Sequence, residues 1–170
     1  MIIVKSPITI ETINNLSVGD MISISGCIYT GRDAVLPKIV SLIKSGKISD
    51  YDIQLKGSVI FHTAVSPAGV GPTSSNKYEI ESTIPPLSEA GVKLFLGKGA
   101  LSKGTIEALK QNNSLYAVIP PVTALLKNKT LKQKVIAFRE EGMEAFHLLE
   151  VIEYPAIIAC AHGKSVYNVD

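Results

Sequence analysis

The chain has 170 residues, of which 46% are hydrophobic and 19% are charged, with a formal net charge of +2. This composition excludes an intrinsically disordered protein and predicts a single domain over residues 1–170. Because the positive charge is small and spread along the chain, we expect no nucleic-acid partner. The two cysteines, Cys27 and Cys160, are too few for a disulfide scaffold or a four-cysteine zinc or iron–sulfur site.

The compartment is predicted from missing targeting signals. Met1–Ile10 reaches Pro7 without the long apolar core and cleavage site of a signal peptide. The longest uncharged apolar stretches, Leu115–Leu126 and Tyr154–Ala161, are shorter than the roughly 20 residues of a membrane span. We therefore expect a cytoplasmic protein that does not bind a membrane.

The first half of the chain alternates between strand and helix patterns. Met21–Tyr29 alternates in polarity and is rich in β-branched residues, which predicts a strand. Asp33–Ser45 carries apolar residues at helical spacing and predicts a helix, and Ser58–Thr63 predicts a short strand. The loop that follows, Ala64–Ser75, is rich in glycine and proline and longer than packing requires, as functional loops often are.

The second half continues the alternation. Ser82–Ala90 predicts a helix with Pro85 and Pro86 near its start and Gly91 at its end. Two more helices are expected, at Ser102–Lys110 and Thr123–Lys127. The remaining expected strands are Val92–Leu96, Leu115–Ile119, Lys134–Phe138, His147–Ile152 and Ala156–Ala161. Together these elements predict a mixed α/β fold.

A lysine between two glycines follows one of the predicted strands. Gly97-Lys98-Gly99 is not a phosphate-binding loop, because five residues separate Gly91 from Gly97 and no Ser or Thr follows the lysine. Lys98 nevertheless lies at the carboxyl end of a strand, the end that faces the ligand crevice in open α/β sheets. The alternative is a turn with a solvated lysine.

Two other stretches carry polar groups suited to binding an anion. Arg32 follows a strand, and its guanidinium can clamp a carboxylate, although a surface arginine is the alternative; Asp33 is expected to cap the following helix. The stretch GPTSSNK, which ends at Lys77, places several hydroxyls between a turn and a cation; an ordinary capping loop is the alternative.

The remaining reactive residue types give weaker signals. His62, His147 and His162 have no metal-binding spacing, and His147 is expected to be structural. No Gly-x-Ser-x-Gly motif supports serine hydrolysis. Cys27 and Cys160 lie in predicted strands and are expected to be small core residues, so this chain is expected to hold no metal.

Arg32, Thr73, Lys77 and Lys98 share a position at strand ends or in the long loop. Cations and hydroxyls without a carboxylate pair suit a small substrate that has two carboxylates. Spacing alone does not show that these residues converge.

Four motifs in order, SGCIYTGRDA, GPTSSNK, EAGVKLFLGKG and GMEAF…LEVIEYPAI…HGKSVY, resemble the beta subunit of class I fumarate hydratases. In single-chain members this is the C-terminal domain, and L-tartrate dehydratase beta subunits are similar. The resemblance runs from about Ile10 to Tyr167 and implies a swivelling, three-layer β/β/α domain. It also implies a partner alpha subunit whose three cysteines hold a [4Fe–4S] cluster. The iron left open to substrate acts as a Lewis acid.

The implied reaction is the reversible hydration of fumarate to L-malate, and the family expectation is an alpha–beta pair that doubles into a tetramer. By resemblance, Arg32 binds a substrate carboxylate, Thr73 exchanges the C3 proton, and Lys98 is the lysine of the Gly-Lys-Gly turn. Lys77 stands where a second substrate arginine is usual, and Ser74 replaces a usual threonine.

Other departures from the family pattern are Leu36, where a histidine is common, and Pro120-Pro121 in place of Gly-Gly. The alternatives are an L-tartrate or other dicarboxylate dehydratase beta subunit, or a non-catalytic carboxylate-binding module.

Overall fold

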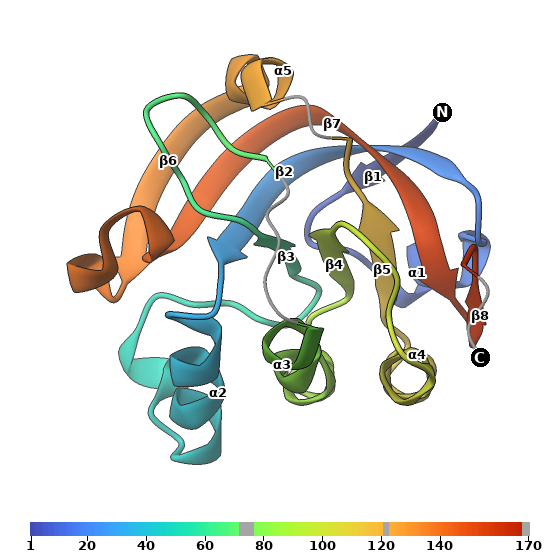
Figure 1. The fold of residues 1–170 in the computed structure, drawn as a ribbon, viewed down its shortest axis with the longest axis horizontal. Helices are drawn as coiled ribbons and strands as arrows, with labels where there is room; N and C mark the ends of the chain where they lie inside the picture. The colour runs from blue at the N-terminus through green and yellow to red at the C-terminus, as the bar shows by residue number, and fades with distance from the viewer. Residues whose placement is uncertain (72–76, 121–122, 168–170) are drawn as a thin grey trace.

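The computed structural model describes residues 1–71, 77–120 and 123–167 and shows the predicted mixed α/β fold, dominated by one sheet (Figure 1). The eight strands are β1 (Ile2–Lys5), β2 (Met21–Gly31), β3 (Val59–His62), β4 (Leu94–Gly97), β5 (Leu115–Val118), β6 (Thr130–Ala137), β7 (Phe146–Ala161) and β8 (Lys164–Ser165). The α-helices are α1 (Ile10–Asn15), α2 (Leu36–Lys44), α3 (Lys77–Glu89), α4 (Lys103–Gln111) and α5 (Thr123–Asn128). Two 3-10 helices are η1 (Ile48–Asp50) and η2 (Arg139–Glu144).

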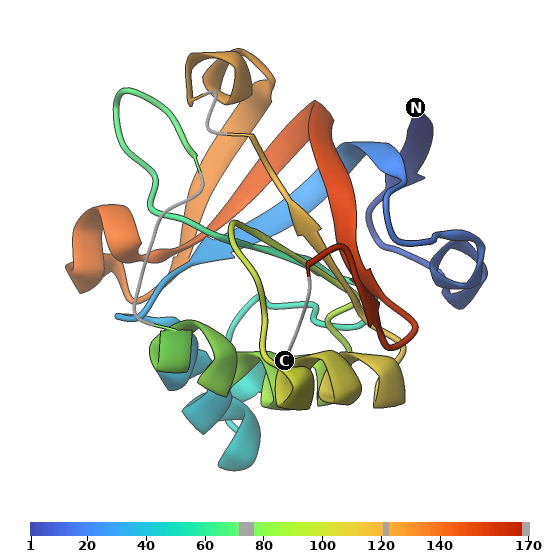
Figure 2. The same ribbon diagram turned by 45° about the vertical axis from the view of Figure 1, so that its right-hand side comes forward.

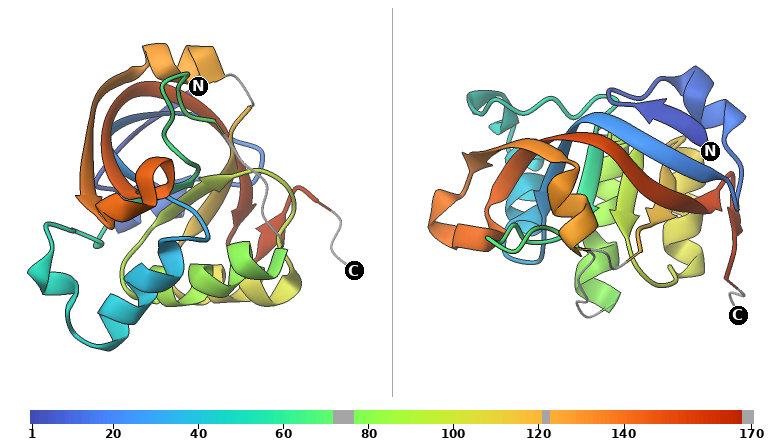
Figure 3. Two further views of the ribbon diagram at one scale, coloured as in Figure 1. Left: turned by 60° about the vertical axis from the view of Figure 1, so that its left-hand side comes forward. Right: turned by 90° about the horizontal axis from the view of Figure 1, so that it is seen from above.

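The sheet closes on itself. Its order is β1-β2-β3-β4-β5-β7-β6, and β2 also pairs with β7, so β2, β3, β4, β5 and β7 form a strand ring. Strands β1 to β5 run parallel to one another, whereas β7 is antiparallel to both β5 and β2. Strand β7 has 16 residues and bends together with β2 over the interior (Figure 3), and it therefore reaches both β5 and β2.

Two apolar cores lie on the two faces of the ring strands. The inner core gathers the residues that point into the ring, among them Ile24, Phe61 and Leu149. Their chain neighbours point outward, so Ile60 belongs to the second core, with Ile39 and other apolar residues of helices α2, α3 and α4. These three helices lie together on one side of the sheet (Figures 1 and 2).

Several predicted elements match closely. Strand β2 begins at Met21 as expected, and α2 has Pro37 in its first turn and ends before Gly46, whose φ of 72° stops a helix. Helices α4 and α5 each lie within one residue of the predicted bounds.

Other expectations were wrong or incomplete. Helix α3 begins at Lys77, five residues before the predicted start, so Pro85 and Pro86 lie inside it. The two strands predicted near the C-terminus are one strand, β7, because Glu153 (φ 52°) sits at a register shift rather than in a turn. Strand β1 and helix α1 had not been predicted.

Only one of the two cysteines lies in the core as predicted. Cys160 is buried as predicted, but the expectation for Cys27 is wrong: it is exposed, because it lies on the opposite face of β2 from the buried Ile28. In the part of the chain that the structure describes, no helix is long and apolar enough to cross a membrane.

Candidate functional site

The parallel strands bring separate sequence motifs to one edge, here called the carboxyl edge. Arg32 follows β2, His62 ends β3 and Lys98 follows β4. Gly31 pairs with His62, and Phe61 pairs with Leu96. Arg32 and Lys98 therefore leave the sheet two strands apart, which is about 10 Å at the usual strand spacing. The structure thus places Arg32 and Lys98 at the same edge of the sheet.

Arg32 already has an acidic neighbour. Its Nε lies 3.6 Å from Oε1 of Glu144, the last residue of η2, and 24% of its side chain is exposed. A guanidinium carries five N–H donors in a plane, so one carboxylate at Nε does not exhaust its capacity. The group is thus anchored at the carboxyl edge with a geometry suited to a second carboxylate.

Three titratable groups beside Arg32 were not predicted as a cluster. Asp33 does not cap α2, whose N-cap is Val35 without a side-chain bond. Its Oδ1 instead lies 3.4 Å from Nε2 of the buried His62. A hydrogen bond with Asp33, and then that carboxyl's charge, raise the pKa of Glu79. The structure therefore brings two carboxyl groups, Asp33 and Glu79, together, which the sequence pattern did not indicate.

Lys98 is exposed and belongs to a short connection, the Lys98 loop (residues 98–102), between β4 and α4. Two polar side chains hold this loop through hydrogen bonds. The Tyr116 hydroxyl donates to the Gly99 carbonyl at 3.0 Å, and Ser102 donates to the Glu81 carboxylate through its backbone N–H and its hydroxyl. Burial raises the pKa of Tyr116, so its hydroxyl stays a donor at neutral pH.

The GPTSSNK motif is only partly described. Thr73 and Ser74 lie outside the described residues, and Lys77 is placed by its backbone as the first residue of α3. The chain approaches this motif at the carboxyl edge, because Thr63, which follows β3, donates its hydroxyl to the carbonyl of Gly71. The predicted roles of Thr73, Ser74 and Lys77 therefore stay predictions.

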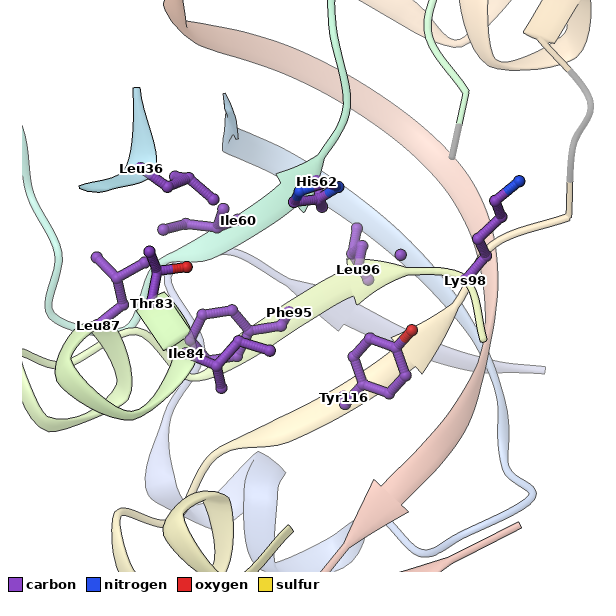
Figure 4. Close-up of a pocket in the computed structure, with 11 residues that line it drawn as sticks. Leu36, Ile60, His62, Thr83, Ile84, Leu87, Phe95, Leu96, Lys98 and Tyr116 are labelled. Atoms are coloured by element: carbon purple, nitrogen blue, oxygen red, sulfur yellow. The ribbon is translucent and has the colours of Figure 1, made fainter. Parts of the chain in front are cut away.

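A small cavity lies beneath the edge, between helices α2 and α3 and the ends of β3 and β4. The residues His62, Thr83, Lys98 and Tyr116 line it together with apolar residues, and the Lys98 ammonium points away from it (Figure 4). Its volume of about 20 Å³ suits about one water molecule. The cavity is therefore too small for a dicarboxylate, and Lys98 lies at its rim.

The other two histidines have structural partners. His147 is buried as predicted and lies with Nδ1 2.8 Å from the Ala145 carbonyl. His162 lies with Nε2 2.8 Å from the Leu16 carbonyl. Among the described residues, no three His, Cys, Asp or Glu side chains are arranged to hold a metal ion.

A sequence model for a family described as "Fumarase C-terminus" matches residues 1–169. The chain belongs to this family. It is 31% identical to a Geobacillus stearothermophilus protein named "Putative fumarate hydratase class I" over 99% of its own length, but spans only 34% of that relative. It is 30% identical to a "Putative L(+)-tartrate dehydratase subunit beta" of Methanocaldococcus jannaschii, over 95% of this chain and 88% of the relative. An L(+)-tartrate dehydratase subunit beta of Escherichia coli is 28% identical over 96% of this chain and 85% of its own length.

The cysteines of this family member do not fit a cluster site. Cys27 pairs with Glu150 of β7, whereas Cys160 lies ten residues further along the same strand. Ten strand residues correspond to about 33 Å of strand, and Cys160 is buried. The two thiols therefore cannot ligate one iron–sulfur cluster within this chain.

Proposed function

We propose that the chain is the beta subunit of a hydro-lyase that hydrates fumarate reversibly to L-malate in an active site shared with an alpha subunit. The observation that carries the proposal is the convergence of Arg32 and Lys98 on the carboxyl edge. Two long cationic side chains whose backbones leave the edge about 10 Å apart suit the two carboxylates of a short diacid. Relatives named as fumarate hydratases and tartrate dehydratase beta subunits support a hydro-lyase.

The residues of this chain would bind the substrate and stabilise charge. Arg32, Lys77 and Lys98 would hold the carboxylates, with Ser74 as a further donor. Thr73 would exchange the C3 proton. A threonine hydroxyl is a very weak acid, and nearby cations would lower its pKa by stabilising the alkoxide. The same cations would stabilise the aci-carboxylate that forms as the proton leaves.

The iron–sulfur cluster is proposed for the alpha subunit, since the cysteines of this chain do not fit it. In this proposal the chain is one swivelling β/β/α domain that closes over the partner in the cytoplasm. The division of labour explains why the chain offers cations and hydroxyls at its edge. A tricarboxylic acid cycle role follows if fumarate is the substrate.

L-tartrate is the second candidate substrate, because two of the relatives above are named as tartrate dehydratase subunits. Tartrate carries two hydroxyls that fumarate lacks, and a site built for them leaves polar groups unpaired when fumarate binds. Substrate choice therefore depends on groups around the carboxylates rather than on Arg32 and Lys98.

The test is anaerobic co-expression with a candidate alpha chain that carries three cluster cysteines. We expect the two chains to co-purify and to hydrate fumarate or dehydrate L-tartrate only together. Malate formation by this chain alone would contradict the proposal. The lack of a stable complex with any such partner would also contradict it, and would favour a non-catalytic binding module. In the complex, Thr73→Ala should abolish turnover while assembly persists, and Ser75→Ala is the matched loss of a hydroxyl from the same stretch.

A further inference from the structure

Lys98 stands in a segment that would be flexible on its own. Gly97 and Gly99 flank it, and Gly99 has a φ of 85° that favours glycine. A long ammonium side chain on a flexible loop loses conformational entropy when it binds a carboxylate. A precise contact with substrate therefore requires something else to hold the loop.

Tyr116 holds the middle of the Lys98 loop. Its ring is 3% exposed on β5, and its hydroxyl donates to the Gly99 carbonyl, one residue after Lys98. Figure 4 shows the hydroxyl pointing toward the end of β4, where Lys98 begins. Gly97 lies directly beside the ring: an added Cβ would lie 3.4 Å from the hydroxyl oxygen, at van der Waals contact.

Glu81 holds the end of the loop. It is 9% exposed on α3, and its carboxylate accepts the Ser102 backbone N–H at 2.6 Å and the Ser102 hydroxyl at 2.7 Å. Ser102 is the N-cap of α4 but makes no side-chain cap bond, so Glu81 supplies the acceptor that the helix start needs. Glu81 also lies about one turn after Lys77 on the same helix.

We infer that Tyr116 and Glu81 are positioning residues that fix Lys98, and its loop relative to α3, for contact with the substrate carboxylate. Glu81 thereby ties together the two segments that carry Lys77 and Lys98. The inference rests on the proposed function for the role of Lys98, and on the two anchors for its mechanism. It assigns neither residue a contact with substrate.

The kinetic test uses the alpha–beta complex and compares single with double variants. Lys98→Met should raise KM about 10- to 100-fold, the range for a lost hydrogen bond to a charged group. Tyr116→Phe should raise KM about 2- to 10-fold, as expected for a neutral hydrogen bond, with a smaller change in kcat. Adding Tyr116→Phe to Lys98→Met should raise KM no further, because the tyrosine acts through the lysine.

The matched control is Tyr154→Phe, which removes a buried hydroxyl bonded to Thr130, away from the carboxyl edge. It should lower stability and leave KM unchanged. Ser102→Ala tests the second anchor, because it removes one of the two bonds to Glu81 and keeps the backbone bond. Additive effects of Tyr116→Phe and Lys98→Met on KM would overturn the inference.

A second readout does not depend on turnover. Reductive methylation with ¹³C-formaldehyde labels the lysines of the full chain, and the Lys98 signal is the one that Lys98→Arg removes. We expect a dispersed signal in the wild type that moves toward the position of a free lysine in Tyr116→Phe and Ser102→Ala. An unchanged Lys98 signal in both variants would overturn the inference. If the wild-type complex turns over no dicarboxylate, the proposed function fails while this signal still tests the positioning.

Discussion

Arg32 faces an acidic residue of its own chain, Glu144, and is proposed to bind a substrate carboxylate as well. Oε1 of Glu144 lies 3.6 Å from its Nε, and a planar guanidinium can bind a carboxylate through two N–H groups at once. A lysine in its place would offer a single point charge that Glu144 would also attract. The fork geometry, and not the charge alone, is therefore what this position needs.

Arg32→Lys should raise the KM for the dicarboxylate about tenfold in the alpha–beta complex, because one of two charge-assisted hydrogen bonds is lost. Steady-state kinetics at fixed ionic strength measures the effect. Arg139→Lys, the same change at an exposed position of η2, is the matched control and should leave KM unaltered. Wild-type values of both KM and kcat for Arg32→Lys would show that Arg32 does not bind substrate.

His147 links the fold to pH. Burial lowers its pKa, with a smaller contribution from Arg139, while its bond to Ala145 acts in the opposite direction. The folded chain therefore resists protonation that the unfolded chain accepts below the ordinary pKa of about 6.5. The free energy of unfolding should fall as pH drops from 7.5 to 5.5, and continue to fall until the lowered pKa is passed.

Urea unfolding at pH 7.5 and 5.5 measures this loss. His147→Gln keeps an N–H donor but cannot titrate, so the variant should lose less stability than the wild type between the two pH values. His162→Gln makes the same substitution at an exposed position and is the matched control. If His147→Gln responds to pH as the wild type does, burial of His147 does not cause the acid sensitivity.

At the scale of elements, β2 bends at Gly26. The register between β2 and β7 shifts there, and Gly26 has a φ of 113°. A Cβ at this position would lie 2.8 Å from the Ser6 carbonyl oxygen, closer than real Cβ contacts. Glycine is therefore required both by the backbone conformation and by the segment that follows β1.

Gly26→Ala should lower the free energy of unfolding by about 1–3 kcal/mol, the usual range for a strained backbone conformation. Gly104→Ala in α4 is the matched control: its Cβ would meet no atom within 4 Å, and alanine should stabilise the helix by about 1 kcal/mol. Chemical denaturation of both variants gives the two values. A Gly26→Ala variant as stable as the wild type would show that β2 relaxes around the added methyl group.

Local signals explain which elements could be predicted from sequence. Helices α2 and α4 have clear apolar periodicity and stop signals, whereas the start of α3 depends on a tertiary contact. Pro85 and Pro86 favour a helix that begins just before them. Glu81, which precedes both, accepts a hydrogen bond from Ser102 at the start of α4. Likewise, Glu153 and Pro155 suggest a turn, yet pairing with β2 carries β7 through them.

At the scale of the whole molecule, closure of the strand ring depends on contacts that sequence patterns do not contain. Strands β7 and β2 pair although they lie near opposite ends of the sequence, as in the pair Met21–Ile157. The positions of Arg32 and Lys98 at strand ends could be predicted, but their place on one edge depends on the parallel pairing of β2, β3 and β4. The contact of Asp33 with His62 could not, because Asp33 reads equally well as a helix cap.

The ring also bears on whether the chain unfolds as one unit. The ring strands border both cores. Ile24 points into the ring, and Ile39 of α2 packs in the second core against the outer face of these strands. Loss of either core exposes one face of shared strands and removes the support of the other. The two cores should therefore unfold together, as expected of a single domain.

Ile24→Val and Ile39→Val remove one methylene group from each core at fully buried positions. Each should cost about 0.5–1.5 kcal/mol. Because the cores share strands, each variant should shift the unfolding midpoint equally by far-ultraviolet circular dichroism, which follows helices, and by tyrosine fluorescence, which follows packing. Separate midpoints for the two probes, moved by only one variant each, would show two independently unfolding units. A single shared transition would support the predicted single domain, since the helices that carry the second core could not detach while the ring stayed closed.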